Sequence, residues 1–174
     1  MSENAKTLSQ AGGDTFDLTE LTAELIVDEG ERLTAYTDTV GLVTIGIGRE
    51  LSRKGISHDE SRYFFHNDVQ ACADVMDKDI PWWRKLAPNE QRVMINLCFM
   101  GWGSFSQFHR FLSAMEAVAD IRGGSFEAGN SVTPFLNTAV AELQNSKWWQ
   151  QVKTRGPRVV ARLLGPSATS DLVA

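Results

Sequence analysis

Two acidic residues lie close together in the stretch DEGERLTAYTDTVGLVTIGIG, residues 28–48, and their types suit acid–base chemistry. Glu29 ends a predicted helix, where the helix dipole and the neighbouring acids favour its protonated form. Asp38 falls in a predicted turn that is more open to solvent, where a carboxylate stays ionised. Glycoside hydrolysis needs two such carboxyl groups, because one protonates the leaving oxygen while the other stabilises positive charge on the sugar or directs a water to it.

Two further residues of this stretch fit the same chemistry. Thr44 carries a hydroxyl that can hold a water, and Gly48 removes a side chain where a polymer would approach the backbone. Most acids near a turn are surface charges, so the residue types alone leave that alternative open.

The elements that must position these residues form a small lobe. Residues 17–30 predict a helix that Asp17 caps and Gly30 ends. The stretches 32–38 and 42–48 alternate and are rich in β-branched residues, which predicts two strands joined by a turn.

The rest of the chain predicts helices. Ser57 and Glu60 form a second capping pair, which opens a helical pattern that runs to Pro81 and is long enough to join two lobes. Within residues 89–103, the run from Val93 to Phe99 is apolar nearly all round, as in a buried central helix. The predicted fold is α+β and mostly helical: a flexible arm at 1–16, a small α/β catalytic lobe at 17–56, an interlobe helix at 57–80 and a helical lobe at 81–174.

Composition excludes several classes of protein. Apolar residues make up 43% and charged residues 22% of the chain, which is ordinary for a globular protein. A net charge of −5 argues against nucleic-acid binding, and no apolar run approaches the roughly 18 residues of a membrane span. The N-terminal stretch MSENAKTLSQAGGDTFD has neither the basic start nor the apolar centre of a secretory signal.

Cysteine and histidine residues indicate no metal site. Cys72 and Cys98 stand far apart without a CxxC motif, and His58, His66 and His109 are scattered. We expect reduced structural thiols and no cofactor.

The stretch with the two acids resembles the active-site region of the phage-type lysozymes, the endolysin muramidases of glycoside hydrolase family 24. Their pattern is Glu, eight residues, Asp, five residues, Thr and then an Ile-Gly-x-Gly run, which Glu29, Asp38, Thr44 and TIGIG match. Further resemblance, from about residue 25 to 163, lies in three stretches: ISHDESRYFFHNDVQ, INLCF and KWWQQVKTRGPRVV. It implies a small α/β lobe and a helical lobe with the cleft between them.

Carried over by this resemblance, Glu29 is the catalytic acid, and Asp38 and Thr44 position the attacking water. Arg155 falls where the family has an arginine that pairs with the catalytic glutamate across the lobes. That pairing would oppose the effect of the helix dipole, so no net direction is predicted for the acid. Phe99 falls where an aromatic residue lines the cleft and binds substrate; the alternative is a phenylalanine of the core.

The chain departs from the family pattern at several positions. Arg49 replaces a histidine, and the acid that pairs with that histidine is still present as Asp68, which predicts an Arg49–Asp68 ion pair. Met100 replaces a polar amide that often contacts the sugar, and Glu50 stands where the family can have an apolar residue. An insertion of undefined role is expected around residues 118–131.

The resulting functional prediction is a phage endolysin that hydrolyses the β-1,4 bond between N-acetylmuramic acid and N-acetylglucosamine with inversion. We expect a monomer made in the host cytoplasm that reaches peptidoglycan in the periplasm after a holin permeabilises the membrane, without direct contact with that holin. Two alternatives stay open: a virion-associated muramidase and a non-catalytic glycan-binding module on the same fold.

Overall fold

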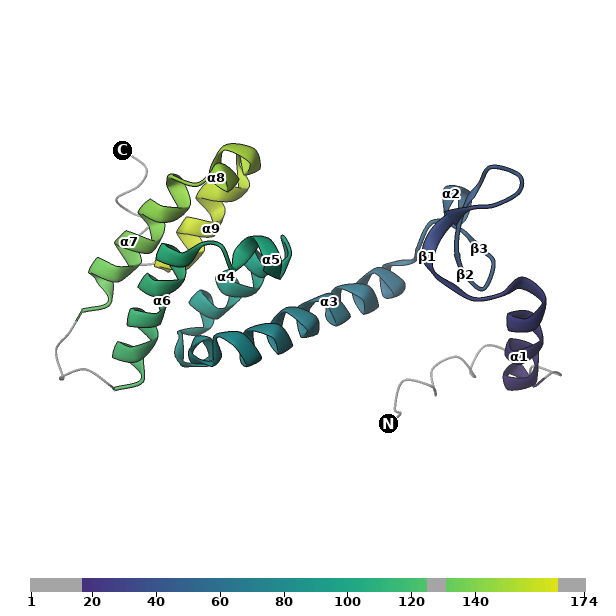
Figure 1. Ribbon diagram of the computed structural model, residues 1–174, viewed down its shortest axis with the longest axis horizontal. Coiled ribbons are helices and arrows are strands. Elements are labelled where there is room, and N and C mark those ends of the chain that lie inside the picture. Colours follow the sequence, from purple (N-terminus) through teal and green to yellow (C-terminus); the bar gives the residue numbers. More distant parts are fainter. Residues whose placement is uncertain (1–16, 125–130, 166–174) are drawn as a thin grey trace. The chain divides into compact units, whose positions relative to one another are not determined.

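The computed structural model describes residues 17–124 and 131–165 (Figure 1). The chain divides into two compact units, Met1–Ser61 and Arg62–Ala174, which we call the small unit and the helical unit. Most of the described residues are helical, and the strands form a small antiparallel sheet, so the predicted α+β class is confirmed. The predicted arm at 1–16 and residues 125–130 of the predicted insertion lie outside the described residues.

The small unit contains two helices and a sheet. In chain order its elements are α1 (Leu18–Glu29), β1 (Arg32–Thr37), β2 (Val43–Gly46), β3 (Arg49–Glu50) and α2 (Leu51–Lys54) (Figure 1). Asp17 caps α1, because its Oδ1 accepts hydrogen bonds from the backbone N–H groups of Thr19 and Glu20 at 2.7 and 3.1 Å. Gly30 ends the helix with a φ of 73°, and its N–H donates to Ile26 O. The predicted limits of this helix are confirmed.

The sheet places Thr44 at its centre. Its strand order is β1-β2-β3, and Thr44 of β2 stands opposite Tyr36 of β1 and Glu50 of β3. Gly46 ends β2 and Gly48 lies in the turn to β3, and their φ values of 63° and 64° fall in a region that favours glycine. The two predicted strands are confirmed, whereas β3 and α2 are too short to show a period in the sequence.

Helix α3 (His58–Asp79) begins with the predicted capping box. The N–H of Glu60 donates to Ser57 Oγ at 3.1 Å, and the N–H of Ser57 donates to Glu60 Oε2 at 2.7 Å. The helix has 22 residues and stops before Pro81, as the pattern predicts. The division between the two units falls in its first turn.

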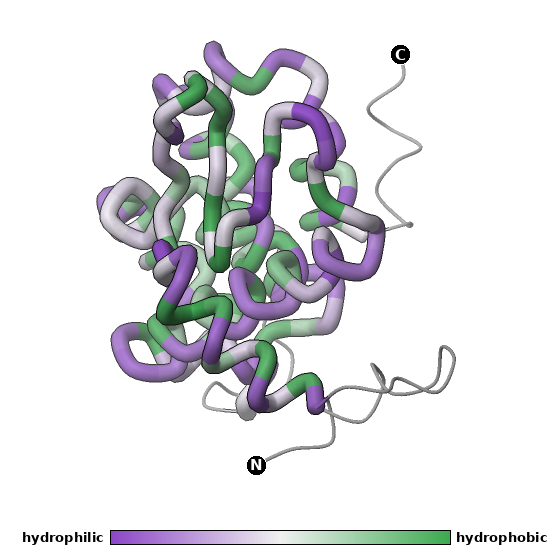
Figure 2. Tube along the Cα trace, turned by 90° about the vertical axis from the view of Figure 1, so that its right-hand side faces the viewer, coloured by the Kyte–Doolittle hydropathy of each residue, from purple (hydrophilic) through white to green (hydrophobic). Residues whose placement is uncertain are grey.

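The helical unit continues with six α-helices and a 3₁₀ turn in its described residues: η1 (Pro81–Lys85), α4 (Pro88–Cys98), α5 (Trp102–Phe105), α6 (His109–Arg122), α7 (Thr133–Gln144), α8 (Lys147–Val152) and α9 (Arg155–Leu164). Hydrophilic and hydrophobic residues follow one another at short intervals along the chain (Figure 2), as in helices that bury one face. No helix in the described ranges is long and apolar enough to cross a membrane.

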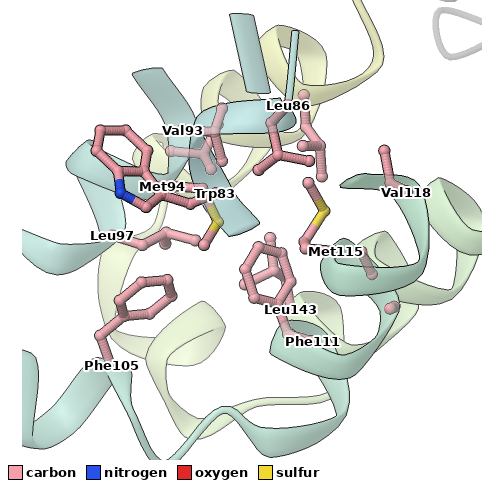
Figure 3. Packing of buried hydrophobic residues seen from close by; sticks show 14 of the residues in the cluster. Trp83, Leu86, Val93, Met94, Leu97, Phe105, Phe111, Met115, Val118 and Leu143 are labelled. Carbon is pink, nitrogen blue, oxygen red and sulfur yellow. The ribbon is translucent and has the colours of Figure 1, made fainter. Parts of the chain in front are cut away.

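The core of this unit lies around α4. Val93, Met94 and Leu97 of this helix are at most 1% exposed, and Figure 3 shows them in one interior with Phe105 and Phe111. The predicted buried central helix is therefore confirmed.

Glu90 is the one fully buried charged residue of the described core. Its Oε2 accepts hydrogen bonds from the N–H of Ala87 and from Arg122 Nε, both at 2.8 Å, and Arg122 Nη2 donates to its Oε1. One carboxylate thus caps the start of α4 and ties it to the end of α6.

Both cysteines are free thiols, and Cys98 is shielded from water. Its Sγ lies 4.0 Å from the backbone oxygen of Cys72, and burial raises the pKa of Cys98 to about 12, with the neighbouring Cys72 thiol adding to the effect.

Cys98 is therefore expected to resist iodoacetamide at pH 8 in the folded protein, because alkylation requires the thiolate. Mass spectrometry should show it modified only after denaturation. Rapid labelling of Cys98 in the native protein would contradict this environment.

Candidate functional site

Glu29 is the last residue of α1 and lies against the glycine turn of the sheet. A Cβ atom built on Gly48 would be 3.4 Å from Glu29 Oε2 and 3.7 Å from its Cδ. Gly48 therefore adopts a positive φ that a side chain would disfavour, and its lack of a side chain leaves space beside the carboxyl group of Glu29. The structure brings these two predicted site residues together, and the Glu29 side chain is exposed in the small unit.

Asp38 is held by the turn between β1 and β2. Its Oδ1 accepts hydrogen bonds from the N–H groups of Val40 and Leu42 at 2.9 and 2.8 Å, and its own N–H donates to Leu42 O. No hydrogen bond from the described residues reaches Oδ2, which can act on another molecule. Asp38, predicted to be open to solvent, is half-buried within the small unit, because the turn folds its amides around the carboxylate.

Thr44 is only 4% exposed. Its hydroxyl donates to Leu42 O at 3.4 Å, a long contact for a hydroxyl donor. The strand register places Thr44 opposite Tyr36. Asp38 lies two residues after Tyr36, and its backbone N–H donates to Leu42 O, which continues the pairing of the two strands. Side chains two residues apart in an extended chain share a face, so Asp38 and Thr44 lie on the same face of the sheet.

Arg155 lies at the start of α9 in the helical unit. Its Nη2 donates to the backbone O and to Oδ1 of Asn96 at 2.7 and 3.1 Å, and its Nε donates to the same Oδ1 at 3.3 Å. These bonds fix the guanidinium against α4. The predicted pairing with Glu29 would join the two units and stays a prediction.

Phe99 is a surface residue of the helical unit. It is 42% exposed, its ring centroid is 5.7 Å from that of Phe65, and it lines a pocket of 520 Å³ with Asp68 and Trp102. The alternative of a core phenylalanine is therefore wrong. Its exposure beside a pocket is what a sugar-contacting aromatic residue requires.

Comparison with known proteins identifies the family. The phage lysozyme family model matches residues 27–127, more than half of the chain, including Glu29, Asp38, Thr44 and Phe99. The chain belongs to the phage lysozyme family. It is also similar to the pre-baseplate central spike protein Gp5 of Enterobacteria phage T4, with 28% identity over 170 residues that cover 79% of this chain and 26% of that protein. The chain thus spans about a quarter of the length of this curated relative.

Arg49 stands at a position where the chain departs from the family pattern, and it contacts residues of its own unit. Its guanidinium contacts the carboxylate of Glu60 at 3.0 and 3.1 Å and donates twice to Gly55 O. The hydrogen bond from the N–H of Ser57 lowers the pKa of Glu60, and Arg49 adds to the lowering. The structure thus gives Arg49 a partner eleven residues away within the small unit. The predicted Arg49–Asp68 pair would join the two units and stays a prediction.

A second pocket, of 690 Å³, lies in the helical unit. Met100, Glu142, Lys147 and Trp148 are among the residues that line it. Trp148 is 7% exposed, and its Nε1 is buried without a hydrogen-bond partner among the described residues. The sequence indicates Met100 as a departure, but it does not show that this residue and an unsatisfied indole donor share one pocket.

Proposed function

We propose that this protein is a muramidase that hydrolyses the β-1,4 bond between N-acetylmuramic acid and N-acetylglucosamine in peptidoglycan. The observation that supports it most is the arrangement of the small unit: Asp38 and Thr44 share a face of the sheet, and Glu29 lies against the glycine turn of the same sheet. Family membership gives this arrangement its chemical meaning.

In the proposed reaction, Glu29 protonates the glycosidic oxygen as the bond to the anomeric carbon breaks. Asp38 Oδ2 accepts a proton from the attacking water, whose oxygen bonds to the anomeric carbon. Two backbone amides on Oδ1 keep this carboxylate from rotating. Thr44 holds the water on the side of the sheet that faces Asp38.

Digestion of purified peptidoglycan tests the reaction. The soluble fragments, reduced with borohydride and identified by mass spectrometry, should end in reduced N-acetylmuramic acid. Fragments ending in reduced N-acetylglucosamine would indicate a different glycosidase. Binding to the polymer without soluble fragments would favour the non-catalytic glycan-binding module.

We further propose that the protein acts as an endolysin, made in the host cytoplasm and given access to the periplasm by a holin. A virion-associated role is the second candidate, and the similarity to a central spike protein favours it. Purified phage particles separate the two roles: an endolysin is absent from them, whereas a virion-associated muramidase copurifies with them.

The stereochemical prediction is that hydrolysis gives the α-anomer at the new reducing end. A buried threonine hydroxyl beside Asp38 fits a site that binds water, and a water between the carboxylate and the sugar leads to single displacement with inversion. Proton NMR of the first product from a defined glycan measures the anomer. An initial β-anomer would mean that Asp38 acts as a nucleophile.

A further inference from the structure

Glu50 is an acid of the small unit to which the proposed reaction assigns no role, and it lies beside Thr44. The two residues are direct partners in the antiparallel pairing of β2 with β3. Such partners project to the same face, with Cβ atoms about 4.5–5.5 Å apart. The side chains of Glu50 and Thr44 therefore start from adjacent positions on the same face of the sheet, although the structure records no hydrogen bond between the carboxyl group and the hydroxyl.

The carboxyl group of Glu50 is mostly buried and poorly paired. Its side chain is 17% exposed, and Oε1 is buried without a hydrogen-bond partner among the described residues. Oε2 lies 3.9 Å from Nη1 of Arg53, whose side chain is 74% exposed. Glu50 precedes α2, but its side chain makes no capping bond. A buried oxygen without a donor is unfavourable, so folding alone gives no reason for an acid here.

Within the described part of the chain, the Thr44 hydroxyl has a proton without a short hydrogen bond, whereas Glu50 Oε1 is an acceptor without a donor. A threonine hydroxyl has one proton to donate and two lone pairs that accept. The Thr44 proton has only the 3.4 Å contact with Leu42 O among the described residues. For Thr44 to accept a hydrogen bond from the attacking water, its own proton must point away from that water.

We propose that Glu50 is a positioning residue whose Oε1 accepts the hydrogen bond of the Thr44 hydroxyl. This inference rests on the proposed muramidase reaction. The hydroxyl then turns a lone pair to the attacking water, which donates one hydrogen bond to Thr44. The water gives its other proton to Asp38 as its oxygen bonds to the anomeric carbon, while Glu29 protonates the departing oxygen. Glu50 itself exchanges no proton.

A double-mutant cycle on peptidoglycan hydrolysis tests this role with the Glu50→Leu, Thr44→Val and combined variants. Glu50→Leu should lower kcat about tenfold or more at nearly constant KM, the effect of one hydrogen bond to a charged group. In the Thr44→Val background the same change should have no further effect, because Glu50 acts through the hydroxyl. Glu50→Gln keeps a carbonyl acceptor, so it should restore most of kcat with an unchanged pH profile.

Controls separate this role from folding and from the proposed function. Glu24→Gln alters an exposed acid of α1 and should leave kcat unchanged. If Glu50→Leu does not fold, Glu50→Met replaces it in the cycle. Wild-type kcat in the folded apolar variant, or equal losses from that change in both backgrounds, would overturn the positioning role. An inactive wild type would overturn the proposed muramidase activity. The same double-mutant cycle, measured as melting temperatures, would then test the contact between Glu50 and Thr44. Additive losses of melting temperature in the combined variant would count against that contact.

Discussion

Glu29→Gln is expected to slow the lysis of chloroform-permeabilised Gram-negative cells by at least about 10²-fold, the usual contribution of general acid catalysis. Glutamine keeps the size of the side chain but has no proton to give to the leaving oxygen. Glu29 is exposed and lies against Gly48, so the amide can occupy the same space without disturbing the sheet. The loss should therefore appear in the turbidity assay while the variant stays folded.

Glu31→Gln is the matched control for this experiment. Glu31 is an exposed acid two residues further along the chain, after the end of α1, and its replacement should leave lysis unchanged. If Glu29→Gln retained most of the wild-type rate, Glu29 would not be the acid. Equal losses in both variants would point to the charge of this segment, not to proton transfer.

Sequence reasoning succeeds where the determinants are local. The Asp17 cap and the Ser57–Glu60 box each depend on residues within three positions of one another, so their pattern is visible in the chain. The apolar spacing of α4 is equally local, and the motif spacing locates Glu29, Asp38 and Thr44. These features account for α1, α3 and α4 and for the choice of the candidate site residues.

The remaining features depend on contacts that no local pattern encodes. Arg49 could pair with any nearby acid, and the turn before α3 brings Glu60 to it. The placement of Glu50 opposite Thr44 follows from the register of a two-residue strand, which has too few residues to show a period in the sequence. The half-burial of Asp38 depends on how the turn places its amides.

The contact between Glu90 and Arg122 is another that no local sequence pattern predicts, because 32 residues separate the two partners. Glu90 is fully buried and its side chain is only 1% exposed, whereas the Arg122 side chain is 33% exposed. Replacing Arg122 by alanine leaves a buried carboxylate with only the Ala87 amide as donor. Removing one partner of a buried ion pair costs about 3–5 kcal/mol, and the partial exposure of Arg122 favours the lower end.

Arg122→Ala is therefore expected to lower the free energy of unfolding by about 3 kcal/mol, or roughly 6–12 °C in melting temperature. Arg110→Ala is the control, because Arg110 is 83% exposed and 3.7 Å from Glu142, so its loss should change stability by about 1 kcal/mol at most. Combining Arg122→Ala with Glu90→Gln should restore part of the stability, because the amide carries no charge and its oxygen still accepts from Ala87. Urea unfolding measures all four proteins. A double variant no more stable than Arg122→Ala would mean that lost packing of the arginine, and not an unpaired buried charge, causes the destabilisation.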